Sequence, residues 1–176
     1  MIPSKNNKNL AKSCRETKSS CCYKGLIFLP DEEYFKILEY TQLNLEEHAE
    51  EFMARCKKYD GFYLYDQKSK CQFLDEIGSG SCRLHDKGVK PSECFWWPLH
   101  VYVGDEDELE IKVSNCCSGC LLINKDDVQK IKKDAERIGY DLFAKLRQVH
   151  PCGETYAVVE KISLPSGAPV AGKLYI

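Results

Sequence analysis

Cysteine is the residue type in this sequence with the clearest capacity for chemistry, since eleven cysteines occur among 176 residues. Three of them, Cys71, Cys82 and Cys94, share the stretch that ends at Pro98. Glycines and a proline between them favour turns over long regular elements. Apolar residues directly follow the first and third cysteines. We therefore expect these sulfurs in loops at the edge of a packed core, where cysteines hold a metal or form disulfides.

The other cysteines fall on both sides of this stretch. Thiolates bind zinc tetrahedrally and hold iron–sulfur clusters, and both uses need about four soft ligands that converge. Two adjacent cysteines direct their side chains apart, so such a pair serves two sites, or supplies one ligand and one packing residue. The candidate metal ligands are Cys21, Cys22, Cys71, Cys82, Cys94 and Cys117, with Cys14, Cys116 and Cys120 as further candidates.

The spacing of the cysteines slightly favours an iron–sulfur cluster over zinc. A structural zinc site usually combines two Cys-x-x-Cys knuckles, and only Cys117 and Cys120 have that spacing here. We expect an iron–sulfur cluster or zinc as the cofactor, held in one larger cluster or in two sites. Cys56 lies on the apolar stripe of an expected helix and is interpreted as a packing residue. Cys116 and Cys152 are each interpreted as either a packing residue or a metal ligand, and the sequence does not favour one role over the other.

Charge and hydropathy narrow the range of partners. A net charge of -2 and a pI near 6.1 give no electrostatic case for nucleic acid. No segment approaches the roughly 20 apolar residues that span a membrane, and the N-terminal sequence has no apolar run typical of an exported protein. We expect a cytoplasmic protein, where clustered cysteines point to metal. A secreted scaffold stapled by disulfides is the alternative.

A small α+β domain is expected to position the sulfurs. Residues 1–13 are polar and lack periodicity, which predicts a flexible N-terminal tail, and residues 14–176 are expected to form a single domain. Apolar periodicity predicts three main helices, over residues 30–40, 44–59 and 124–149. Short apolar runs and the alternation of apolar and polar residues predict single strands at residues 26–29 and 156–162. They also predict two short hairpins, which pair residues 62–64 with 70–74 and residues 99–103 with 109–113. The helices would serve as scaffold for cysteine-bearing loops around a metal site.

Aromatic and histidine side chains lie close to these cysteines in the sequence. Phe95, Trp96 and Trp97 follow Cys94 directly, and we interpret them as a wall that shields the metal site. His85 lies in the same stretch and could act as a ligand or a base, although a solvated or structural role is favoured.

The order of these motifs resembles the YkgJ-type cysteine-cluster family, which is described as a zinc- or iron-chelating domain. The matching segments, from about residue 14 to 120, are Cys21 to Asp31, Cys71 to Glu76, Cys82, Pro91 to Pro98, and Cys117-Ser118-Gly119. The chain departs from the family pattern at several places. Six residues separate Cys14 from the cysteine pair, where the family has closely spaced cysteines. Lys90 and Phe95 each stand where the family has an arginine, and Ser118 stands where it has a proline. The resemblance implies metal binding, by zinc or an iron–sulfur cluster.

The function expected from the sequence is metal binding through loop cysteines. A metal-dependent enzyme, acting in redox chemistry or on another protein, is the alternative from a different class, and the sequence leaves open whether the chain is an enzyme. The expected partner is the metal ion or cluster itself, with no nucleic acid and no membrane. The sequence does not point to a protein partner.

Overall fold

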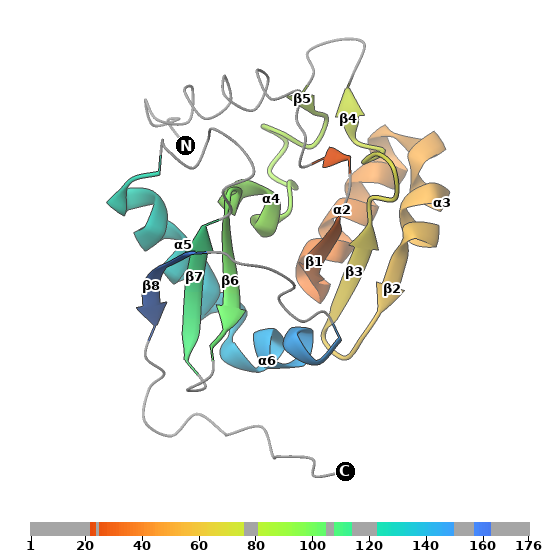
Figure 1. Cartoon of the computed structure of the whole chain (residues 1–176). Helices are drawn as coiled ribbons and strands as arrows, with labels where there is room; N and C mark the ends of the chain where they lie inside the picture. Colours follow the sequence, from red (N-terminus) through yellow and green to blue (C-terminus); the bar gives the residue numbers. More distant parts are fainter. Residues whose placement is uncertain are drawn as a thin grey trace.

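Two three-stranded antiparallel sheets form the frame of the molecule (Figure 1). The computed structural model describes residues 22–23, 25–75, 81–104, 108–113, 123–149 and 157–162. One sheet has the order β1-β3-β2, with bounds Leu26–Pro30, Phe62–Asp66 and Cys56–Lys58. The other has the order β6-β7-β8, with bounds Leu99–Val103, Leu109–Val113 and Ala157–Ile162. A short third ladder pairs β4 (Leu74–Asp75) with β5 (Ser81–Cys82).

Five helices accompany these sheets in the described part of the chain. Their bounds are Asp31–Asn44 (α2), Glu46–Arg55 (α3), Ser92–Trp96 (α4), Lys125–Ile138 (α5) and Tyr140–Val149 (α6). Helices α2 and α3 lie beside the β1-β3-β2 sheet, α4 lies between the two sheets, and α6 passes below both in the view of Figure 1. The combination of helices with antiparallel sheets confirms the predicted small α+β fold.

The β1-β3-β2 sheet is buried on both faces. Phe28 and Leu64 are direct partners in the β1–β3 ladder and belong to the first core, which continues into β6, β7, α5 and α6. Leu29 and Tyr65 lie on the opposite face and belong to the second core. This second core also contains Ile37, Phe52, Cys71, Phe73 and Leu84. Burial on both faces explains why apolar residues occupy successive positions in these strands.

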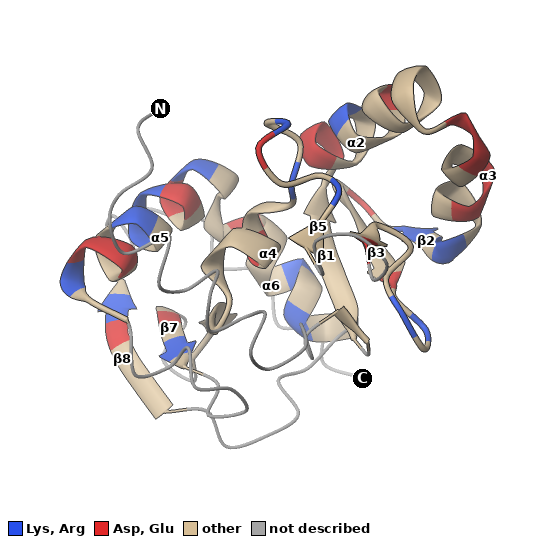
Figure 2. Cartoon of the chain, turned by 90° about the horizontal axis from the view of Figure 1, so that it is seen from above, with Lys and Arg blue, Asp and Glu red and all other residues tan. Residues whose placement is uncertain are grey.

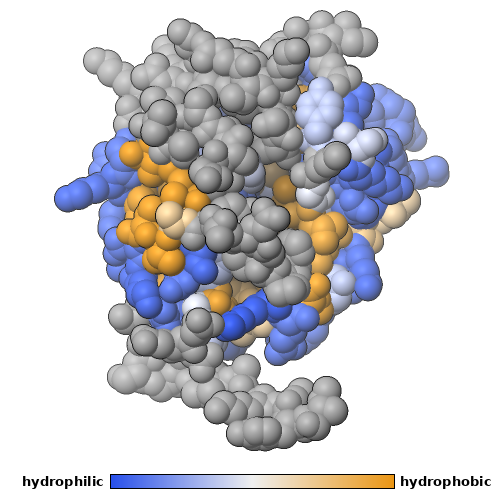
Figure 3. Space-filling model, in the orientation of Figure 1, coloured by the Kyte–Doolittle hydropathy of each residue, from blue (hydrophilic) through white to orange (hydrophobic). Residues whose placement is uncertain are grey.

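The outer surfaces of the helices are charged. Figure 2 shows acidic residues along α3 and both signs of charge on α5. The exposed residues of α3 include Glu46, Glu47 and Glu50. Hydrophobic residues gather over the β6-β7-β8 sheet on the face seen in Figure 3, and Val158 and Val159 of β8 are among the exposed apolar residues of the described chain.

The strand predictions are partly confirmed. The hairpin of β6 and β7 forms with Val101 opposite Ile111, and the predicted strands at residues 26–29 and 156–162 are present as β1 and β8, with Tyr156 outside the described residues. The predicted pairing of residues 62–64 with 70–74 is wrong. Because both faces of β3 are apolar, β3 takes the centre of a sheet between β1 and β2, and Leu74 instead pairs with Cys82.

The helix boundaries also differ from the prediction. The first helix extends past residue 40, and the second ends at Arg55, because residues 56–58 pair with β3 as strand β2. Asn44 does not begin the second helix; it is the last residue of α2, and its side chain donates to the Tyr40 carbonyl. The predicted helix over residues 124–149 is two helices. Asn124 caps α5 as expected, with a complete capping box to Asp127, but Gly139 ends α5 with a φ of 95° and α6 begins at the next residue.

The flexible tail predicted for residues 1–13 lies outside the described residues. None of the helices in the described ranges is long and apolar enough to cross a membrane.

The break between α5 and α6 depends on a glycine. We predict that Gly139→Ala lowers the free energy of unfolding by about 1–3 kcal/mol, because a φ of 95° with a ψ of 143° is a backbone conformation that only glycine adopts readily. Denaturant unfolding followed by circular dichroism measures this change. Gln129→Ala, at an exposed position of α5, is the control and should change stability little. Equal stability of Gly139→Ala and the wild type would show that the break between α5 and α6 does not require glycine at this position.

Candidate metal centre

Four of the predicted ligands, Cys22, Cys71, Cys82 and Cys94, meet at one end of the second core. The Cys71 N–H donates to the Cys22 carbonyl at 2.6 Å. Cys82 lies across the β4–β5 ladder from Leu74, which follows Cys71 by three residues. Cys71, Cys82 and Cys94 line one cavity. The predicted ligands Cys21 and Cys117, and the further candidates Cys14, Cys116 and Cys120, lie outside the described residues.

Cys71 and Cys82 each open a turn of the same construction. The Cys71 carbonyl accepts the N–H of Leu74 at 3.1 Å, and the Cys82 carbonyl accepts the N–H of His85 at 2.9 Å. In each turn, a backbone hydrogen bond from the second residue after the cysteine, Phe73 or Leu84, lowers the pKa of the cysteine thiol. We call these segments, Cys71–Leu74 and Cys82–His85, the two cysteine turns. Amide N–H groups directed at sulfur favour the thiolate over the thiol.

Cys94 reaches the same cavity from a short helix rather than from a loop. It is the third residue of α4, which is tethered at its start by two carboxylates. Glu33 accepts the Ser92 N–H at 3.0 Å and also the Ser92 hydroxyl. Glu93 accepts the N–H of Phe28, in β1, at 2.6 Å. Burial of Glu33 raises the pKa of its carboxyl, although the two Ser92 donors act in the opposite direction.

Burial opposes ionisation of these thiols. The pKa of Cys71 is raised to about 11. Desolvation is the largest cause and nearby Cys22 and Cys82 add to it, whereas the Phe73 amide and the Tyr65 hydroxyl act in the opposite direction. Desolvation also raises the pKa of Cys82 and, more strongly, of Cys94. The metal-free protein therefore holds neutral thiols at neutral pH.

Lys90 is the basic residue that acts on two of these sulfurs. Its charge lowers the pKa of Cys82 and of Cys94 against the larger effect of burial. The Lys90 ammonium also lies 4.9 Å from the centre of the Phe95 ring and 3.4 Å from His85 Nδ1. A cation beside this cavity favours the negative charge that thiolates would bring.

The cavity itself has a volume of about 20 Å³ and is nearly all apolar. This volume holds about one water-sized atom. Its lining residues besides the three cysteines are Ile27, Leu29, Ile37, Phe52, Tyr65, Gln67, Phe73, Leu84 and Pro91. Gln67 is 2% exposed, and its side-chain Oε1 has no hydrogen-bond partner among the described residues. A buried polar atom without a partner is costly.

The expected aromatic wall of Phe95, Trp96 and Trp97 does not line this cavity. Phe95 is 41% exposed, Trp96 packs in the first core, and the Trp97 ring meets His100 edge-on. Trp96 points away because its indole N–H donates to Asp134 of α5. The cavity is covered by side chains of the second core instead.

Two histidines, His85 and His48, and Cys56 lie outside the cavity lining. His85 contacts Lys90 and Phe95, and its side chain is 40% exposed. His48 lies on α3 with its ring 3.0 Å from Arg83. Cys56 begins β2 and packs against the second core, as its interpretation as a packing residue requires. Burial raises the pKa of Cys56 to about 12.

The described cysteine side chains are of a type that binds soft metals, but in their present positions they do not surround an ion. Within the described ranges, no three Cys, His, Asp or Glu side chains are arranged so that they could hold one ion as they stand. Thiols around an apolar cavity and amide N–H groups aimed at sulfur nevertheless fit zinc or iron in chemical type. Comparisons with protein-family models, curated proteins and solved structures give no match to this chain.

Sequence reasoning missed three residues near the sulfurs, Arg55, Tyr65 and Gln67. The alternation in β3 places Tyr65 on the same face as Tyr63, so its burial could have been expected. Its proximity to Cys71, six residues later, depends on the path of the intervening loop. No local pattern indicates that Gln67 is buried or that Arg55 holds that loop.

The raised thiol pKa values predict slow alkylation in the folded, reduced, metal-free protein. At about pH 8, labelling of Cys71 by iodoacetamide should be on the order of 100-fold slower than in the unfolded chain, because only the thiolate reacts. The rate should rise with pH until the pKa of about 11 is passed. Peptide mass spectrometry resolves each cysteine, and the chain in denaturant is the control. Equal rates in the folded and unfolded chain would show that these thiols are not buried.

Proposed function

We propose that this chain is a cytoplasmic metal-binding protein whose cysteines hold zinc or iron, the iron as a single ion or as an iron–sulfur cluster. The observation that carries the proposal is the pair of cysteine turns, each with a backbone N–H directed at sulfur, beside a cavity shared with Cys94. Cys22 lies next to Cys71 and is the fourth proposed ligand. Four thiolates complete the coordination that zinc and iron–sulfur centres use.

The size of the cavity favours a single ion over a cluster. A volume of about 20 Å³ accommodates about one small atom, whereas a cluster of several irons and sulfides needs more room. The proposal includes inward movement of the cysteine side chains around the ion, since the described side chains could not hold one as they stand. Binding would release the thiol protons, so the affinity should rise with pH.

Other features support the same proposal. The resemblance to the YkgJ-type family, carried by Cys71, Cys82 and Cys94 among other segments, implies a chelating role. The charge of Lys90 would offset part of the negative charge that four thiolates bring to a divalent ion. When bound, the metal would stabilise the thiolates and cross-link the segments that carry them.

Metal analysis of protein purified without oxygen tests the proposal. The wild type should contain near-stoichiometric zinc or iron, and sulfide with a brown colour would identify a cluster. Cys71→Ser, Cys82→Ser and Cys94→Ser should each weaken binding by at least about 10-fold, because each removes a thiolate ligand. Cys56→Ser is the matched control and should retain the metal, since Cys56 does not line the cavity.

Two results would contradict the proposal. Wild-type protein that takes up neither zinc nor iron after anaerobic reconstitution would exclude a metal centre. Paired cysteines, counted as missing free thiols in denatured and unreduced protein, would favour the disulfide scaffold. An enzymatic role would need a substrate site beside the cysteines.

A further inference from the structure

Tyr65 makes a hydrogen bond to one of the proposed ligands. Its hydroxyl donates to the Cys71 sulfur, with 3.7 Å between oxygen and sulfur. Both residues are buried, at 3% and 8% exposure. The Tyr65 ring packs against Phe52 and Phe73, with ring centres 5.6 and 6.3 Å away. The contact therefore lies inside the second core, where water does not compete with it.

A second hydrogen bond to the Tyr65 oxygen agrees with this direction. The Gln72 N–H donates to the Tyr65 oxygen at 3.3 Å, so this oxygen already acts as an acceptor. The single hydroxyl hydrogen is then free to point at the sulfur. A tyrosine hydroxyl keeps its hydrogen at neutral pH, because its ordinary pKa is about 10.

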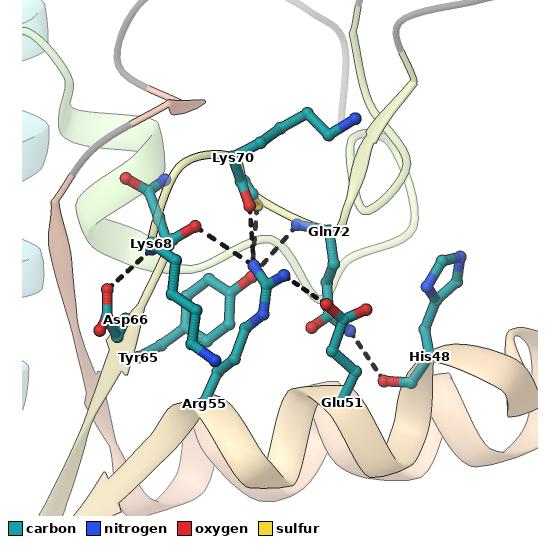
Figure 4. Close-up of polar contacts among 10 residues, drawn as sticks. His48, Glu51, Arg55, Tyr65, Asp66, Lys68, Lys70 and Gln72 are labelled. Carbon is teal, nitrogen blue, oxygen red and sulfur yellow. Dashed lines mark hydrogen bonds and ion pairs between the residues drawn. The ribbon is translucent and has the colours of Figure 1, made fainter.

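The loop that carries Cys71 is clamped to α3. The Arg55 guanidinium donates to the Gln67 carbonyl at 3.2 Å and to the Lys70 carbonyl at 2.7 Å, and it pairs with Glu51 (Figure 4). The Gln72 side chain donates to the His48 carbonyl at 2.8 Å. These bonds hold the loop on both sides of Cys71, so the distance between Tyr65 and the sulfur is set by the fold.

We propose that Tyr65 is a positioning residue whose hydroxyl donates a hydrogen bond to the Cys71 thiolate in the metal-loaded protein. This hydrogen bond raises the affinity for the metal and lowers the electron density on the Cys71 sulfur. This inference rests on the proposed metal-binding function. A hydrogen bond withdraws electron density from the thiolate, and hydrogen bonds of this kind tune metal sites. Cys71 would then be a less electron-rich ligand than it is without the hydroxyl.

Tyr65→Phe removes the hydroxyl and keeps the ring. Cobalt(II) is the probe, because sulfur-to-cobalt charge-transfer bands report the electron density on the thiolates. Tyr65→Phe should bind cobalt about 10-fold more weakly and move the charge-transfer band to lower energy. Tyr63→Phe is the matched control. Tyr63 lies on the same strand and the same face, but its ring stacks on Tyr34, 3.5 Å away, and it forms no hydrogen bond with any of the described cysteines.

A second replacement distinguishes an electronic effect of the Tyr65 hydroxyl on the Cys71 sulfur from a purely structural role of the side chain. A fluorinated tyrosine at position 65 keeps the ring and hydroxyl but is a stronger donor, so the band should move to higher energy. An unchanged band in Tyr65→Phe, whether or not the affinity falls, would overturn the inference, as would equal shifts in Tyr65→Phe and Tyr63→Phe. If Tyr65→Phe does not fold, the fluorinated protein is the test. The inference is overturned if its charge-transfer band does not move to higher energy. Failure of the wild type to bind cobalt, zinc or iron would instead refute the proposed function.

Discussion

The burial of cysteine sulfur in an apolar cavity is the constraint on which the rest of the structure depends. A thiolate in such surroundings is costly, and burial raises the pKa of Cys71, Cys82 and Cys94. Backbone N–H groups in the two cysteine turns and the charge of Lys90 act in the opposite direction, but they are weaker than desolvation. The chain thus holds neutral thiols that a bound cation would convert to thiolates.

The fold meets this constraint by building a second core beside the first. Successive residues of β1 and β3 point to opposite faces, so one sheet supplies a wall to both cores. Helices α2 and α3 close the second core with Ile37 and Phe52. The cysteines occupy the end of this core, where the loop after β3, the β4–β5 ladder and α4 converge.

The sequence predicts local features of this structure better than long-range ones. Alternation correctly predicts the β6–β7 hairpin, and Asn124 correctly predicts the start of α5, because both depend on neighbouring residues. Flanking apolar residues correctly place Cys71 at the edge of a core. The clamp from Arg55 to the Lys70 carbonyl is set by tertiary packing and has no local signal. The five-residue α4 is too short for its periodicity to be recognised. Metal binding itself stays a prediction.

X-ray absorption at the edge of the bound metal tests the central claim most directly, because it reports the atoms that surround the ion. The account predicts a first shell of about four sulfurs, at about 2.3 Å if the metal is zinc. A neighbouring iron scatterer would identify a cluster within the same thiolate site. A shell made only of nitrogen and oxygen would contradict the account, because the cysteines around the cavity would then not be the ligands.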